Sequence, residues 1–390
     1  MINIKDRYFS LNRILLLIIG LWPYKKSILA RLQIICFFII VVTAIIFNLT
    51  TFMTSKCTAN LLLKVFSIVF AHIMGVIKYC AFVVNQETVK NLMEQLQHMY
   101  DNLKDNKEIA IVEKYGNNAK RYTIILTIMV GIGLSTMIIV HLWPAFFHFI
   151  LSVNQSRPRH LQVMAEYFVD QEKYFYLLLF HTIAAISIGI FAVVATGTTL
   201  IAFLQHACGM FRIASYRIEH IMEIYTLKNV NLLKQNKVYE GLIYAINIHR
   251  EAIMFCNYFM TKFEITFLFL IVTGVISLSL NLYRIVIFDY NIEEFLIIFG
   301  NIVITLSYMF LSNFLGQDII NHNNNVYVTA YKVRWYTALL HIQKLILFLL
   351  QRGNKAFGLN VGGLFVASLE CFSTLLNASM SYFTLMYSVL

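Results

Sequence analysis

Charged residues and prolines are scarce in this sequence, and their scarcity narrows the class of protein. Only 13% of the 390 residues are charged, 59% are hydrophobic, and three are proline. A water-soluble domain of this length exposes far more charge, whereas a bilayer needs about 20 apolar residues for each helical crossing. The alternation of apolar and polar residues that marks a membrane β-strand is also missing. The composition therefore predicts an all-α membrane protein.

Motifs for catalysis and metal binding are absent as well. There is no HExxH, no GxSxG and no glycine-rich phosphate loop, and the six cysteines show no metal-binding spacing. We therefore expect no enzyme, cofactor or metal. The formal net charge of +11 comes from basic residues spread over the loops rather than gathered in one patch. Attraction to anionic membrane lipids explains this distribution, and we expect no nucleic-acid partner.

Hydropathy predicts seven membrane spans in a single membrane domain. The sequence shows neither an internal repeat nor a linker rich in serine, glycine or proline. Several apolar stretches exceed the length of one crossing, which indicates tilted helices or helices that continue into the cytosol. We place the spans near 32–54, 61–85, 122–150, 174–206, 263–283, 295–318 and 359–388.

Basic residues predict the orientation of these spans, because lysine and arginine near span ends are retained in the cytosol. Of the 31 basic residues, 24 fall in the N-terminal segment and in alternate loops, whereas 5 fall in the other three loops. The N-terminus is therefore predicted to be cytosolic and the C-terminus extracellular. Lys64 and Lys78 lie in the second span, and Lys78 is near enough to the cytosol for its ammonium to reach water. Asn154 begins an Asn-Gln-Ser sequon in an outer loop and is a glycosylation candidate.

A G-protein-coupled receptor is the alternative from another class, and two absences disfavour it. Spans five to seven contain no proline, although rhodopsin-like receptors kink those helices with proline. Among the six cysteines only Cys57 falls in an outer loop, so no disulfide can join two outer loops. The predicted orientation is also inverted relative to that class.

Two cytosolic segments, 207–262 and 319–358, carry apolar residues at helical spacing. They predict helices that extend the neighbouring spans and present a sizeable apolar surface just inside the membrane. Such a surface either packs within the chain or joins subunits of an oligomer. The residues alone leave both interpretations open.

A set of short sequences, in one order along the chain, carries a family resemblance. They are Gly-Leu-Trp-Pro-Tyr before the first span, Phe-Leu-Gly-Gln-Asp around Gly316, Tyr331 with Trp335, then Ser-Leu-Glu-Cys-Phe and the terminal Ser-Tyr-Phe-Thr-Leu-Met. The chain resembles an insect odorant receptor over nearly its whole length, most strongly over 310–390. Because 207–262 is too short for the insertion of the family's shared co-receptor, it resembles an odour-tuning subunit. A gustatory receptor of the same fold is the alternative, disfavoured by a different C-terminal pattern.

The resemblance implies a mechanism. Members of the family are similar to ligand-gated, cation-permeable channels in which four subunits surround one pore. The last helix of each subunit lines that pore, and cytosolic helices, here 207–262 and 319–358, form an anchor between subunits. A tuning subunit is expected to assemble with the co-receptor in the plasma membrane of olfactory neuron dendrites.

The expected ligand is a small, volatile, apolar odorant, so its site should be an aromatic and aliphatic cavity in the outer half of the bundle. Asn301, Ile304 and Thr305 match, by their distance from Gly316, positions that line the pocket in family members. The outer halves of spans two, three and four supply the candidates Phe70, His72, Met74, Met137, His141, Trp143, Phe180 and Ala184.

The expected pore residues lie in the last span. In the family an apolar ring near the outer end of the last helix, just after Tyr-Phe, closes the pore by excluding water. That position corresponds to Leu385 here, with Ser388 and Val389 close by. Glu370 is the one carboxylate well inside a predicted span. Because an ionised carboxylate is costly in lipid, we expect Glu370 to border the inner vestibule of the pore.

Overall fold

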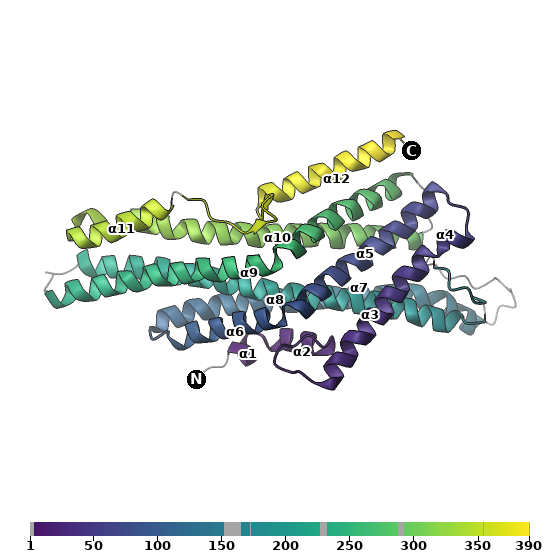
Figure 1. Ribbon diagram of the computed structural model, residues 1–390, viewed down its shortest axis with the longest axis horizontal. Helices are drawn as coiled ribbons and strands as arrows, with labels where there is room; N and C mark the ends of the chain where they lie inside the picture. The colour runs from purple at the N-terminus through teal and green to yellow at the C-terminus, as the bar shows by residue number, and fades with distance from the viewer. Residues whose placement is uncertain are drawn as a thin grey trace.

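Long helices run the length of the molecule in the computed structural model (Figure 1). The structure describes residues 4–151, 165–171, 173–226, 232–287, 292–353 and 355–389, and describes no side chains for 140–151, 226, 232–234, 287 and 292–293. The first elements are α1 (Ile4–Arg7), α2 (Ser10–Ile18), α3 (Ile28–Leu49), α4 (Thr51–Thr54), α5 (Ala59–Val84), α6 (Gln86–Asp101) and α7 (Asn106–Leu151). The others are α8 (Phe175–Thr226), α9 (Leu232–Ile287), α10 (Ile292–Lys332), the 3-10 helix η1 (Trp335–Thr337), α11 (Leu340–Gly353), β1 (Asn360–Val361), β2 (Phe365–Val366) and α12 (Leu369–Val389).

Six helical segments in the described ranges are long and apolar enough to cross a membrane. They are α3 with α4, then α5, α7, α8, α9 and α10, and they overlap the first six predicted spans. α12 is also of span length, at 21 residues, but serines, threonines and an asparagine interrupt its apolar sequence. The chain is therefore an all-α membrane protein, as its composition predicted.

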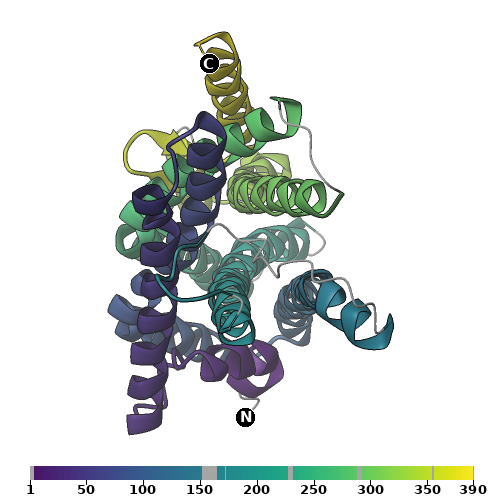
Figure 2. The same cartoon turned by 90° about the vertical axis from the view of Figure 1, so that its right-hand side faces the viewer.

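The two ends of the bundle differ (Figure 1). The α4 end holds α4 and the C-terminal end of α12, and the prediction assigns it to the outside. The α11 end holds α11 and the ends of α8 and α9, which continue well past their predicted spans. α12 lies at one edge of the molecule in both views (Figure 2).

The last helix begins ten residues later than the sequence predicted. Residues 360–366 form a β-hairpin in which Asn360 pairs with Val366 and Val361 with Phe365. Gly362 and Gly363 take positive φ angles of 64° and 68°, which other residues rarely adopt, so they allow the tight turn. The Ser368 hydroxyl then accepts a hydrogen bond from the Cys371 amide at 3.1 Å and caps the start of α12.

The N-terminal helices pack into the bundle against α7 and α8. Phe9 is fully buried and stacks on His206 of α8 with 5.6 Å between ring centroids. Asn12 Nδ2 donates a hydrogen bond to Thr198 Oγ1 at 3.0 Å. Burial raises the pKa of Tyr8 to about 12, so this phenol stays neutral in the core. The segment before the first span is thus part of the folded core.

Candidate functional site

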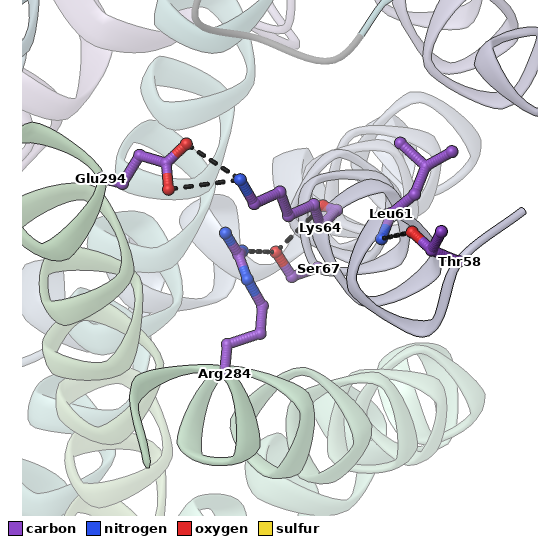
Figure 3. A network of polar contacts seen from close by, with 6 residues as sticks. All are labelled: Thr58, Leu61, Lys64, Ser67, Arg284 and Glu294. Carbon is purple, nitrogen blue, oxygen red and sulfur yellow. Dashed lines mark hydrogen bonds and ion pairs between the residues drawn. The ribbon is translucent and has the colours of Figure 1, made fainter. Parts of the chain in front are cut away.

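Helices α5 and α10 are joined by side chains rather than by backbone packing. Each packs along α8 and α9, whereas α5 and α10 have scarcely any backbone contact with each other. Near the α4 end, Lys64 Nζ on α5 donates to the Glu294 carboxylate on α10 at 2.9 and 3.2 Å. Beside them, Arg284 of α9 donates to the Ser67 hydroxyl (Figure 3). These contacts form a polar bridge at one level of the bundle.

A second bridge lies 14 residues further along both helices, about 21 Å deeper at 1.5 Å per residue. There the Lys78 ammonium of α5 sits 4.0 Å from the centroid of the Tyr308 ring on α10. The prediction that Lys78 reaches cytosolic water is wrong, because its side chain turns into the bundle and the residue is only 4% exposed. The two bridges thus bound a region between α5 and α10.

Side chains between the two bridges leave hydrogen-bonding capacity. Ala71 of α5 is exposed, and Met74 and Asn301 are partly exposed. Thr305 is buried, yet its hydroxyl makes no hydrogen bond to any described residue. By contrast, the hydroxyl of Thr196 in α8 donates to the carbonyl four residues earlier. A small ligand with a polar group would find partners in this region.

The predicted ligand residues do not all converge here. By helical spacing Met74, Asn301 and Thr305 lie on the facing sides of α5 and α10. Phe70 instead packs against a cluster that includes Leu280 and Tyr283 of α9, and side chains of α12 pack against the same cluster. The remaining predicted ligand residues with described side chains are His72, buried on α5; Met137, half-buried on α7; Phe180, 71% exposed, and Ala184, half-buried, on α8; and Ile304, exposed on α10.

His72 has an unsatisfied ring nitrogen. Its Nδ1 lies 2.9 Å from the Ile68 carbonyl, while Nε2 is buried without a partner.

The side chains of His141 and Trp143, and the whole of Asn154, lie outside the described part of the chain. Sequence reasoning missed Tyr308 and the pairing of Lys64 with Glu294. The visible signal was two lysines in one apolar span, each of which requires a polar or aromatic neighbour.

One face of α12 is polar and exposed in the described chain. The opposite face, with Cys371, Leu375 and Ser379, packs against α9 and α10. Leu385 is 58% exposed and lies beside the polar face, and Val389 is 75% exposed at the end of the helix. The polar face consists of the exposed residues Glu370, Thr374, Asn377, Ser381, Thr384 and Ser388, spaced alternately by four and three.

Hydroxyls on this polar face are satisfied by their own helix. Thr374 donates to the Glu370 carbonyl at 3.0 Å, Ser381 to the Asn377 carbonyl at 2.8 Å, and Ser388 to the Leu385 carbonyl at 2.8 Å. Glu370 stands in the first turn of α12, and its side chain is exposed. The helix therefore holds a polar face outward without needing partners from the same chain.

A separate polar cluster ties three helices together deeper in the bundle. Asp318 of α10 accepts from Gln205 at 3.3 Å and from the Cys208 thiol at 3.8 Å, both on α8. His322 Nδ1 lies 3.2 Å from the Asp318 carboxylate, and its Nε2 lies 2.7 Å from the Tyr115 hydroxyl of α7. Cys208, Asp318 and His322 are metal-ligand types within 4.8 Å of one another. Each already has a hydrogen-bond partner, so we assign the cluster a structural role.

The fold defines a multi-pass helical membrane protein. The sequence model of the 7tm odorant receptor family matches residues 58–380. The chain therefore belongs to the odorant receptor family, as its terminal motifs predicted.

Individual relatives agree with this assignment. The chain is 30% identical over 99 residues to odorant receptor 10 of Aedes albopictus, covering 25% of this chain and 26% of that one. It is 23% identical over 146 residues to the odorant receptor coreceptor of Aedes aegypti, covering 37% and 30%. The matched regions thus span less than a third of these relatives. The olfactory receptor OR5 of Machilis hrabei, solved in complex with eugenol, shares the fold with a TM-score of 0.74 at 14% identity over 99% of both chains.

Proposed function

We propose that the chain is the odour-tuning subunit of an odorant-gated cation channel. The observation that carries the proposal is the polar face of α12. A membrane-crossing helix with Thr374, Asn377 and Ser381 on an uncovered face is unfavourable against lipid but suited to an aqueous pore. Copies of this chain and of a co-receptor subunit, four in all, would turn these faces toward a common axis.

In this arrangement Leu385 forms an apolar constriction beside the hydroxyls of Thr384 and Ser388, with Val389 one turn beyond. A ring of leucines excludes water from a narrow pore, so ions pass only when the ring widens. Glu370, in the first turn of α12, borders the inner vestibule and attracts cations. The segments 207–262 and 319–358 supply the anchor between subunits.

The odorant site in this proposal is the region between α5 and α10, bounded by the bridges at Lys64 and Lys78. An odorant opens the pore only if it prefers the open arrangement of these helices, because equal affinity for both states shifts nothing. α10 contacts α12, so a ligand that moves α10 has a direct path to the pore helix.

Recordings from cells that express this chain with and without a co-receptor subunit test the proposal. We expect a panel of volatile odorants to evoke cation currents when both chains are present, and cells with the co-receptor alone provide the control. If no odorant evokes a current that depends on this chain, the tuning function is refuted.

The proposed orientation is tested separately. The plasma membrane of an olfactory neuron dendrite is the expected location, with the N-terminus cytosolic, the C-terminus outside and Asn154 open to glycosylation. Epitopes at each end of the chain, probed on intact cells, should be accessible at the C-terminus alone. An accessible N-terminus with a hidden C-terminus would contradict the channel assignment.

A further inference from the structure

Lys78 is a buried cation with no anion in contact. It has no hydrogen bond or ion pair within the described part of the chain, and its one interaction is with the ring of Tyr308. The carboxylate on α10 closest to Tyr308, Asp318, lies ten residues or about 15 Å further along the helix and is bonded to Gln205 and Cys208. Glu294 lies about 21 Å away in the other direction and is bonded to Lys64. Ionisable groups at membrane depth are found paired or facing a polar cavity, so the environment of Lys78 is incomplete as it stands.

The surroundings of the Lys78 amine keep one side open. Position 197 of α8 is glycine, and a Cβ there would come within 3.3 Å of Lys78 Nζ. The Tyr308 ring faces the ammonium from α10 and stabilises it through its electron-rich face. A ring is not a hydrogen-bond acceptor in the usual sense, and an ammonium has three N–H donors. These donors have no oxygen acceptor among the described residues.

The groups between the bridges are polar on α10 and apolar on α5. Thr305, one turn before Tyr308 on α10, offers a hydroxyl without a partner, and Asn301 lies one turn further. Ala71 and Met74 of α5 supply apolar surface between the bridges. A molecule with an apolar body and one oxygen at its deep end complements this arrangement.

We propose that Lys78 and Tyr308 form the floor of the odorant site and select odorants that carry a carbonyl or carboxylate oxygen. The oxygen accepts a hydrogen bond from the Lys78 ammonium, while the apolar body lies along Ala71 and Met74 toward the bridge at Lys64. This inference rests on the proposed function and adds the chemical class of the ligand.

The test compares ligands that share one carbon skeleton. Cells expressing this chain with the co-receptor are exposed to an alkane, the matching aldehyde or ketone, and the matching carboxylic acid. We expect the oxygen-bearing ligands to act at concentrations at least about tenfold lower than the alkane, because a hydrogen bond to a charged group is stronger than one between neutral groups.

Lys78→Met should abolish this preference by raising the half-maximal concentration of the oxygen-bearing ligand at least about tenfold while leaving the response to the alkane unchanged. Lys56→Met, at an exposed position before α5, is the matched control and should change neither response. Because Lys78→Met alters a buried site, surface labelling of a C-terminal epitope must confirm that the variant reaches the membrane.

A second variant keeps the inference testable if Lys78→Met fails to reach the surface. Gly197→Ala adds a methyl group 3.3 Å from Nζ and should weaken the same ligand class selectively. Odorant-evoked currents without any preference for an oxygen-bearing ligand would overturn the inference and leave the channel proposal intact. Equal losses for alkane and carbonyl ligands in both variants would also overturn it. A chain that gives no odorant-evoked current at all would refute both proposals.

Discussion

The 195–218 segment of α8 and the whole of α12 carry similar polar side chains in opposite surroundings. In α8, Thr196, Thr198 and Ser215 are fully buried among α7, α9 and α10. In α12, Thr374 and Ser381 stand on an uncovered face. Both helices satisfy hydroxyls through carbonyls of their own backbone. Hydroxyls in a span can therefore lie inside the bundle, as in α8. They can also lie on an exposed face that is available to a partner outside the chain, as in α12.

The largest effect is expected from enlarging a side chain in the buried segment. Ala214 of α8 is fully buried, so Ala214→Leu overpacks a close-packed core at a typical cost of about 1–3 kcal/mol. We expect a several-fold lower amount of this variant at the cell surface, measured by labelling an outer epitope. Ser381→Leu on α12 is the matched control, because its side chain is exposed and donates only to a carbonyl of its own helix, and this variant should reach the surface normally. Equal losses for both variants would show that α12 is as enclosed as α8.

The second effect concerns the proposed constriction. Leu385→Ala shortens the side chain that would exclude water, so we expect a several-fold larger current in the absence of odorant. Leu177→Ala is the control, because Leu177 is similarly exposed, at 66%, on α8. Its basal current should match that of the unaltered chain. If both changes leave basal current unaltered, Leu385 is a packing residue and the gate lies elsewhere.

The sequence predicted the membrane fold well, because continuous apolar stretches leave few alternatives to a spanning helix. It failed at 360–366, where two adjacent glycines permit a hairpin that hydropathy does not detect. The polar face of α12 was readable as Glu370, Thr374, Asn377 and Ser381 at helical spacing. The prediction singled out only Glu370 and Ser388 of this face and did not connect them through the residues between.

The candidate site was harder to predict, because side chains from separate helices meet only after folding. Nothing in the sequence pairs Lys78 with Tyr308, which lie 230 positions apart. Asn301 and Thr305 were proposed because the resemblance fixed their distance from Gly316. Phe70 was proposed from its span alone, and its position on the helix places it against the cluster with Leu280 and Tyr283 of α9 instead.

A smaller effect is expected from removing the charge at the base of α12. Glu370→Gln keeps the size of the side chain and removes its negative charge, so a cation passing an inner vestibule would lose a nearby attraction. We expect a measurable fall in the ratio of cation to anion permeability, read from reversal potentials. Glu240→Gln, on the exposed surface of α9 near the α11 end, should leave reversal potentials unchanged. A variant at Glu370 with unaltered selectivity would favour a structural role for this carboxylate.

The smallest effect is expected at the bridge between Lys64 and Glu294, because both side chains are partly exposed and such ion pairs contribute about 0–1 kcal/mol. Lys64→Gln or Glu294→Gln should shift the half-maximal odorant concentration by less than about fivefold. The exchanged pair, Lys64→Glu with Glu294→Lys, should recover part of that shift, since it restores attraction across the same two helices. If the shift of the exchanged pair instead equals the sum of the two single shifts, the two side chains do not act as a unit. The boundary of the site at the α4 end would then consist of Arg284 and Ser67, whose hydrogen bond the exchange leaves in place.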